Sequence, residues 1–284
     1  MAGQKGHLLI FGLGYAGRAI ARKAVASGWQ VSATTRGTTT PERGVRLLDF
    51  TRSDVAIANA THIVSTIAPG EDQDPVLARY RPALVASPAA WLGYLSTTGV
   101  YGDAGGTWVD EGTVPNPGSE RTRRRVAAEQ EWGRLGRKLA IFRLAGIYGP
   151  GRSMLDDLRT GQARHVIKPG QCFGRIHRDD IAELVQAALL QQATGIFNGA
   201  DDEPAAPSEV VGEAARLLGV PVPTPVPFDQ AVQSMSAMAR SFWAENRKVN
   251  ASKTKAQLGL SWRYPTYREG LAAILAEECG QSLL

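Results

Sequence analysis

A glycine-rich stretch near the start of the chain has the residue types and spacing of a phosphate-binding turn. Gly12, Gly14 and Gly17 form a GxGxxG pattern between an apolar run at 7–11 and an Ala-rich segment at 15–27. In a strand–turn–helix unit, the first glycine permits the tight turn, the second lets the backbone approach a pyrophosphate, and the third lets the helix pack closely on the strand. The N–H groups of the first helical turn attract the phosphates. The pattern predicts a dinucleotide site, with a glycine-rich turn that binds no ligand as the alternative.

The end of the next expected strand indicates which dinucleotide binds. Sites that prefer NAD place an acidic residue about 20 residues after the motif, where it binds the ribose hydroxyls. Here the sequence is Ala33-Thr34-Thr35-Arg36, without a carboxylate. Arg36 could pair with a 2′-phosphate, and Thr34 or Thr35 could donate a hydrogen bond to it. The sequence therefore favours NADP, with NAD as the alternative if Arg36 is only an exposed loop residue.

Two arginines further along the chain could hold an anion. Arg121 and Arg125 belong to a basic run with Arg123 and Arg124, and their i, i+4 spacing places them on one face of a helix. They either point into a cleft, where they would suit an anionic small-molecule substrate, or pair with Glu129 or solvent. A nucleic-acid surface would need charge spread over one face with interleaved aromatic residues, so we expect no nucleic-acid partner despite the net charge of +5.

Short apolar runs alternate with helical segments through the first half of the chain. We expect strands at 7–11, 30–34, 46–50, 62–67, 91–96 and 140–144, with helices at 15–27 and 125–135. This alternation predicts an α/β fold: a doubly wound, parallel Rossmann sheet with helices on both faces.

The regularity breaks after about residue 150, which predicts a smaller, discontinuous C-terminal substrate lobe. Helices are expected at 181–191, 210–218 and 267–276, with a brief strand at 195–198. We assign 1–150 and about 174–195 to the dinucleotide-binding domain, and about 151–173 and 196–284 to the smaller lobe. The alternating Val-Pro stretch at 220–227 must be extended. It is either a strap across this lobe or a polyproline ligand for a partner.

Composition excludes several classes of protein. The chain has two cysteines, Cys172 and Cys279, without the spacing of a zinc site or a disulfide framework. No stretch reaches the roughly 18 apolar residues of a membrane span, and the N-terminus lacks a signal-peptide pattern. We expect a cytoplasmic protein without metal or membrane partner, and leave a homodimer open.

Several further segments form recognisable motifs besides the glycine turn. They are STTGVYG at 96–102, RLAGIYGPG at 143–151, IHRDDIA at 176–182, and the closing pairs Ser252-Lys253 and Leu258-Gly259. Together and in this order they resemble the short-chain dehydrogenase/reductase superfamily, in its extended or atypical branch of NAD-dependent epimerase/dehydratase-like proteins. The resemblance implies that Asp49 lies beside the adenine and that the stretch from Thr66 to Pro69 lines the cofactor. The candidate cofactor-binding residues are then Gly12, Gly14, Tyr15, Ala16, Gly17, Thr35, Arg36, Asp49, Thr66 and Ala68.

At the active-site positions, this sequence departs from the pattern of the family that it resembles. The family combines a Ser or Thr after the fifth strand with a Tyr-x-x-x-Lys pair, whose tyrosine exchanges a proton with the substrate. Thr97 matches the Ser/Thr position, whereas Arg121 and Arg125 stand at the tyrosine and lysine positions. None of the 7 tyrosines has a lysine four residues on. Because arginine keeps its proton, Arg121 cannot replace the tyrosine as an acid/base.

Two functions therefore remain open from the sequence. One is an NADP-dependent reductase, dehydrogenase or epimerase that uses Thr97, Arg121 and Arg125 in a non-standard site. Tyr101, His177 and Glu120 are conceivable substitute acids, although no spacing singles one out. The other is a non-catalytic NADP-binding regulatory or scaffold protein. The resemblance also disfavours a dehydratase. Dehydratases of this family carry an acidic residue beside the catalytic Ser or Thr, whereas Thr97 is followed by Thr98 and Gly99.

Overall fold

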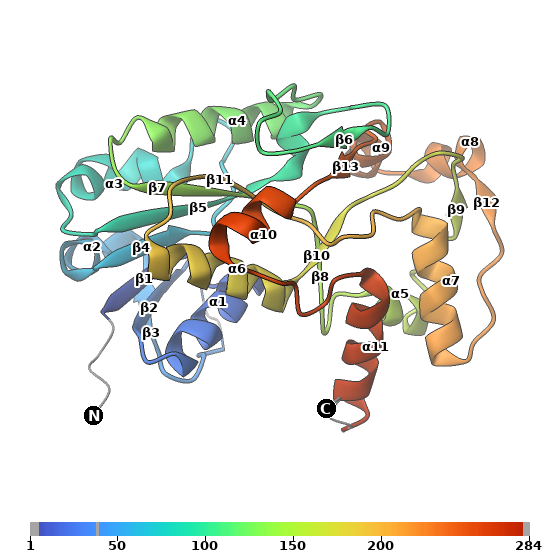
Figure 1. The fold of residues 1–284 in the computed structure, drawn as a ribbon, viewed down its shortest axis with the longest axis horizontal. Coiled ribbons are helices and arrows are strands. Elements are labelled where there is room, and N and C mark those ends of the chain that lie inside the picture. The colour runs from blue at the N-terminus through green and yellow to red at the C-terminus, as the bar shows by residue number, and fades with distance from the viewer. Residues whose placement is uncertain (1–5, 38–39, 281–284) are drawn as a thin grey trace.

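The centre of the protein is a sheet of parallel strands, shown in Figure 1 by a computed structural model that describes residues 6–37 and 40–280. This 7-stranded sheet has the order β11-β7-β5-β4-β1-β2-β3, and every neighbouring pair is parallel. Its strands are β1 (His7–Phe11), β2 (Gln30–Thr35), β3 (Val45–Asp49), β4 (His62–Ser65), β5 (Trp91–Thr97), β7 (Leu139–Leu144) and β11 (Gly195–Gly199). The strand order reverses between β1 and β4, which is where open α/β sheets bind their ligands. The predicted doubly wound Rossmann fold is confirmed.

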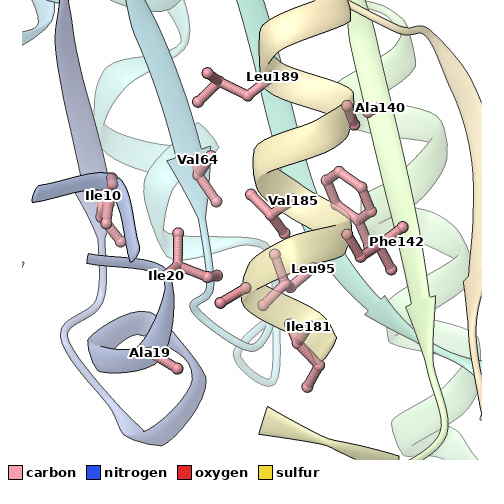
Figure 2. Packing of buried hydrophobic residues seen from close by; sticks show 14 of the residues in the cluster. Ile10, Ala19, Ile20, Val64, Leu95, Ala140, Phe142, Ile181, Val185 and Leu189 are labelled. Atoms are coloured by element: carbon pink, nitrogen blue, oxygen red, sulfur yellow. The ribbon is translucent and has the colours of Figure 1, made fainter. Parts of the chain in front are cut away.

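Helices cover both faces of this sheet because its strands are apolar on both sides. On β1, Leu8 and Ile10 join the core on one face, and Leu9 and Phe11 join the core on the other. The first core lies under α1 (Tyr15–Ala26) and α6 (Arg178–Gln191), as Figure 2 shows for Ile20 and Val185. The second lies under α2 (Asp54–Asn59), α3 (Pro75–Ala86) and α4 (Glu120–Gly133).

Most of the remaining elements lie beyond the carboxyl ends of β5, β7 and β11, on the right of Figure 1. They include three short parallel pairs: β8 (Gly146–Tyr148) with β10 (Arg175–His177), β9 (Val166–Ile167) with β12 (Val226–Pro227), and β6 (Trp108–Val109) with β13 (Lys248–Val249). The helices are α5 (Met154–Arg159), α7 (Pro207–Leu218), α8 (Phe228–Ala231), α9 (Ala237–Trp243), α10 (Ser252–Leu258) and α11 (Tyr267–Glu278). Three short 3₁₀ turns complete the set: η1 (Phe50–Arg52), η2 (Thr98–Tyr101) and η3 (Val232–Ser234). An apolar cluster of their own holds α5, α7 and α11 together.

Several boundaries differ from those expected. Helix α4 starts at Glu120 rather than at 125, because Ser119 and Thr122 form a capping box. The sheet continues to the end of β11, beyond the expected boundary at 195. Leu258 and Trp262, from the segment expected in the smaller lobe, pack into the core under α1 and α6. The division into lobes at the expected residues therefore stays a prediction.

The Val-Pro stretch is extended where it is paired. Its last residues form β12, which runs parallel to β9, and Pro223 accepts a hydrogen bond at 2.8 Å from the ring of His165. These contacts fit a strap across the C-terminal elements. In the part of the chain that the structure describes, no helix is long and apolar enough to cross a bilayer.

Candidate functional site

A side chain would have a different consequence at each glycine of the turn between β1 and α1. Gly12 has φ of +94°, and a Cβ there would lie 2.7 Å from Oγ1 of Thr66. A Cβ on Gly17 would lie 2.2 Å from the carbonyl oxygen of Gly12, so only glycine lets the helix approach the turn this closely. A Cβ on Gly14 would meet no atom within 4 Å. The turn is therefore tight at Gly12 and Gly17 and open at Gly14, as a backbone that admits a pyrophosphate requires.

The first turn of α1 leaves its N–H groups free to face an anion. No described side chain caps this helix, whose N-cap is Gly14. The hydroxyl of Thr66 donates to the carbonyl of Gly12 at 2.7 Å and so fixes the turn to the end of β4. Ala16 is half-buried, and Ala68 is exposed beyond β4. The structure thus brings Gly12, Gly14, Gly17 and Thr66 together around one helix N-terminus.

A second group of predicted residues lies at the ends of β2 and β3. Thr35 and Asp49 are register partners on these strands, and both line a cavity of about 610 Å³ with Arg36. Asp49 caps η1 by accepting a hydrogen bond at 2.7 Å from the backbone N–H of Thr51. This bond lowers the pKa of Asp49. The Arg36 side chain is exposed and has no hydrogen bond or ion pair with another described residue, so it is available to a ligand.

A cavity of about 560 Å³ opens beside the carboxyl ends of β5 and β7. Thr97, Arg121 and Arg125 all line it. The lining also includes Arg152, Arg175 and Arg247, whereas its one carboxylate among the described residues is Glu245, which pairs with Arg247 at 2.7 Å. The cavity therefore has an excess of positive charge suited to an anion.

This cavity is connected to the glycine turn through Tyr15. The Tyr15 hydroxyl donates to the carbonyl of Pro150 at 3.1 Å. The guanidinium of Arg152, a lining residue of the cavity, lies 5.6 Å from the centre of the Tyr15 ring. The first residue of α1 thus contacts the cavity wall, and a molecule in the cavity would lie close to one bound at the turn.

Known proteins share this fold. No family model matches the chain. The solved structure of a functionally unknown conserved protein from Silicibacter pomeroyi DSS is 41% identical, with 96% of this chain and 99% of that chain covered and a TM-score of 0.88. A protein from Methylobacillus flagellatus, described as an NAD-dependent epimerase/dehydratase, is 26% identical, with the same coverage of 96% and 99% and a TM-score of 0.76. The sequence and fold of the chain are thus similar to those of an NAD-dependent epimerase/dehydratase, the group that its sequence motifs resemble.

A curated relative of this epimerase/dehydratase-like chain is a reductase. The 3-diazoavenalumate denitrifying reductase of a Streptomyces species is 29% identical over 177 residues, which cover 56% of this chain and 54% of the reductase. The chain thus aligns with about half the length of that relative.

The two arginines at the family's Tyr-x-x-x-Lys positions have different surroundings. Arg125 donates from Nη1 to the Tyr94 hydroxyl at 3.0 Å and to the Leu95 carbonyl at 2.7 Å. Arg121 lies 4.6 Å over the ring of Phe242, and its buried Nε has no hydrogen-bond partner among the described residues. Burial lowers the pKa of the Arg121 guanidinium, against the opposing effect of Glu245. Arg121 is thus a buried cavity arginine whose guanidinium forms no hydrogen bond or ion pair with the described residues.

The alternative in which Arg121 and Arg125 pair with Glu129 is wrong. Glu129 does not pair with Arg121 or Arg125, because it binds Arg143 at 2.8 Å instead. The basic run divides: Arg121 and Arg125 line the cavity, while Arg123 and Arg124 are ion-paired with Glu120 outside it.

None of the three conceivable substitute acids lines the cavity. The buried Tyr101 hydroxyl donates to Oδ1 of Asn198 at 2.7 Å. His177 packs between the rings of Tyr148 and Tyr264, and burial lowers its pKa to about 4. Glu120 is ion-paired on the outer surface. Thr97 lines the cavity, and its Oγ1 accepts a hydrogen bond at 3.1 Å from Gly99 N–H, which leaves its own proton free to donate.

Sequence reasoning missed the part of the cavity wall that comes from the C-terminal half. Phe242 lies on α9, and Glu245 and Arg247 follow that helix, far from any motif. Arg175 immediately precedes the segment at 176–182 and could have been found as its neighbour. For the other three, no sequence signal indicates that they reach this cavity.

A buried carboxyl behind the cavity wall makes stability depend on pH. Oδ1 of Asp201 accepts a hydrogen bond at 3.3 Å from the backbone N–H of Arg175, while its Oδ2 is buried without a partner among the described residues. Burial raises the pKa of Asp201 from near 3.8 to about 8. The folded state therefore holds this proton more tightly than the unfolded state does. The resulting stabilisation is complete below pH 4 and is lost as the pH rises toward 8, with each pKa unit worth about 1.4 kcal/mol.

We expect Asp201→Asn to remove this dependence, because the amide keeps the shape and does not titrate. Urea unfolding at pH 5 and pH 8 measures it: wild type should lose more stability than the variant between the two values. Parallel losses in the two proteins would contradict the assignment to Asp201.

Proposed function

We propose that the protein is an oxidoreductase or epimerase that binds a nicotinamide dinucleotide, preferentially NADP(H), and acts on a small anionic molecule. The observation that carries this proposal is the arginine-lined cavity of about 560 Å³ whose wall contacts Tyr15, the first residue of α1. A pyrophosphate would lie against the N-terminus of α1, and the adenosine end would extend toward Thr35 and Arg36. The description of the Methylobacillus flagellatus protein names NAD, which supports a nicotinamide dinucleotide as the ligand.

Each polar residue of the cavity has a separate role in this proposal. A bound nicotinamide ring would supply or accept the hydride. The half-buried Arg125 would hold a ribose or phosphate oxygen near β5, because its guanidinium is fixed by Tyr94 and Leu95. Thr97 would donate a hydrogen bond to a substrate oxygen. Arg121 would balance negative charge on the substrate without moving a proton.

The alternative, a non-catalytic NADP-binding regulator or scaffold, makes a different prediction about the cavity. A regulator needs the cofactor site but no small-molecule site beside it. The excess of arginines around an open cavity therefore favours the enzyme. Two assays distinguish the enzyme from a regulator. Oxidation of NADPH followed at 340 nm over a panel of carbonyl acids detects a reductase, and chromatography of hydroxy acids incubated with the protein and NADP⁺ detects an epimerase, which leaves no net change in the cofactor. A regulator shows no turnover in either assay.

Cofactor preference is tested at Arg36. We expect Arg36→Asp to weaken NADPH binding by about tenfold or more, the scale of a lost hydrogen bond to a charged group, and to leave NADH binding equal or tighter. Calorimetric titration of both cofactors at one ionic strength gives the ratio. Arg46→Asp is the matched control, because it is an equal charge change on an exposed residue at the opposite end of β3. An unchanged NADPH/NADH ratio in Arg36→Asp would remove Arg36 from the 2′-phosphate site.

A further inference from the structure

Hydride transfer at a carbon that bears oxygen needs a group that takes up or supplies the proton of that oxygen. Arg121, at the position of the family's tyrosine, keeps its proton. Tyr148 lines the cavity, but burial raises its pKa, and its hydroxyl lies so close to Gly270 of α11 that no Cβ would fit there. The Ser96 hydroxyl donates to the buried Glu129. The hydroxyls of Tyr148 and Ser96 are therefore unsuited to exchange a proton with a substrate.

Glu245 has the features of such a group. Among the described lining residues it carries the one carboxylate, and none of them is a histidine or cysteine. Glu245 is 7% exposed, and its Oε2 binds Nη1 of Arg247 at 2.7 Å. Its Oε1 has no hydrogen-bond partner among the described residues and lies beside Gly118, where a Cβ would be 3.0 Å away. One oxygen thus holds the carboxylate in place, and the other is available to a substrate hydroxyl.

The backbone that carries Glu245 is fixed to two other loops. The Glu245 carbonyl accepts a hydrogen bond at 2.8 Å from Nε2 of Gln171. The next residue, Asn246, donates its N–H to Oδ1 of Asp103 at 2.8 Å and accepts at its own Oδ1 from the N–H of Cys172 at 3.1 Å. A fixed position suits proton transfer, because its rate depends on the distance and alignment of donor and acceptor.

Positive charge faces Glu245 from two elements. Arg247 follows it in the chain, and Arg121 lies near enough on α4 that the Glu245 charge opposes the effect of burial on the Arg121 pKa. Nearby positive charge favours the ionised form of a carboxylate. Glu245 can therefore accept a proton, while Arg121 beside it holds the anionic group of the same substrate.

We propose that Glu245 exchanges the proton with the substrate at its Oε1, in the role that the tyrosine has in the family. In the oxidation of a hydroxy acid, the O–H proton passes to Oε1, the C–H bond breaks, and its electron pair passes with the hydrogen to NADP⁺ as hydride. A carbonyl group is left, and reduction reverses both transfers. Thr97 donates a hydrogen bond to the same substrate oxygen. This inference rests on the proposed function and adds the acid/base that it lacks.

Glu245→Gln keeps the shape of the side chain and removes its ability to accept a proton. Both assays of the proposed function are repeated on the full chain with phenylpyruvate, 2-oxoglutarate and pyruvate, and with the corresponding hydroxy acids. For each acid that wild type turns over, kcat should fall at least about a hundredfold. KM should stay equal or fall, because the variant removes negative charge from a cavity that binds an anion. A carboxylate that only supports the fold would instead raise KM and lower stability, which urea unfolding measures.

Rescue by a small acid tests the same assignment in a second way. Glu245→Ala leaves room for formate, whose carboxylate can accept the proton, so added formate should raise kcat at least about tenfold. Formate should have no effect on Glu245→Gln, where the space stays filled. Asp103→Asn is the matched control, because Asp103 holds the same turn but does not line the cavity. It should leave kcat and KM near their wild-type values.

Three results would overturn the inference and leave the proposed function in place. They are an unchanged kcat in Glu245→Gln, a fall in kcat that comes with a rise in KM and a loss of stability, and a folded Glu245→Ala that formate does not rescue. A wild-type protein that turns over no acid in either assay refutes the proposed function itself, and the inference with it.

Discussion

Replacement of Gly14 by aspartate should abolish NADPH binding without unfolding the protein. Gly14 is the N-cap of α1 with extended backbone, φ −82° and ψ −163°, and a Cβ there meets no atom within 4 Å. Aspartate is a favourable N-cap residue, so the free energy of unfolding should stay equal or rise. Its carboxylate, however, would accept hydrogen bonds from the N–H groups of the first helical turn. It would also place negative charge where the pyrophosphate is proposed to bind.

Thermal unfolding with and without NADPH measures both effects at once. Ligand at about 100 times Kd should stabilise wild type by about 2.7 kcal/mol through mass action, and should stabilise Gly14→Asp not at all. Gly17→Ala is the informative comparison: its Cβ would collide with the Gly12 carbonyl oxygen at 2.2 Å, so it should lose stability even without ligand. A Gly14→Asp protein that NADPH stabilises as much as wild type would show that the cofactor lies elsewhere.

The glycine turn was predictable from sequence because every relation in it is local. The contact between Gly12 and Gly17 spans one turn, and its requirement for glycine follows from backbone geometry alone. The strands were predictable for a similar reason, since apolar runs on both faces of a covered sheet are continuous in sequence. Even so, α3 was missed, because Pro82 interrupts its helical pattern and its start at Pro75 depends on the Asp74 cap.

The cavity was not predictable in the same way because distant segments build it. The sequence placed Thr97, Arg121 and Arg125 in one site, and the structure brings all three to one cavity. It could not distinguish Arg125, which is held by the carbonyl of Leu95 on β5, from Arg121, which is left without a partner by the described residues. That difference depends on the position of α4 over β5 and on where Phe242 arrives from α9, neither of which residue spacing records.

Removal of the Glu129 carboxylate should cause the largest loss of stability, about 3–5 kcal/mol, although it lies outside the cavity. Oε2 of Glu129 binds Nη2 of Arg143 at 2.8 Å, and its Oε1 accepts a hydrogen bond at 2.5 Å from Ser96. Glu129 is 6% exposed and Arg143 is 2% exposed, so Glu129→Ala would leave a buried guanidinium without its counter-ion. Water cannot compensate for a charge at that depth, which is why one deletion costs more than the pair contributes.

The matched control is Glu131→Ala, two residues along the same helix. Glu131 pairs with Arg81 and Arg134, but its side chain is 36% exposed, so its loss should cost far less stability than the loss of Glu129. Replacing both buried partners, Glu129→Met with Arg143→Met, should recover most of the stability lost in Glu129→Ala because no charge then remains buried. Urea unfolding of the three variants at pH 7 gives the comparison. Equal losses in Glu129→Ala and Glu131→Ala would mean that solvent reaches Arg143. The link between α4 and β7 would then be too loose to hold Arg121 and Arg125 in the positions that the proposed site requires.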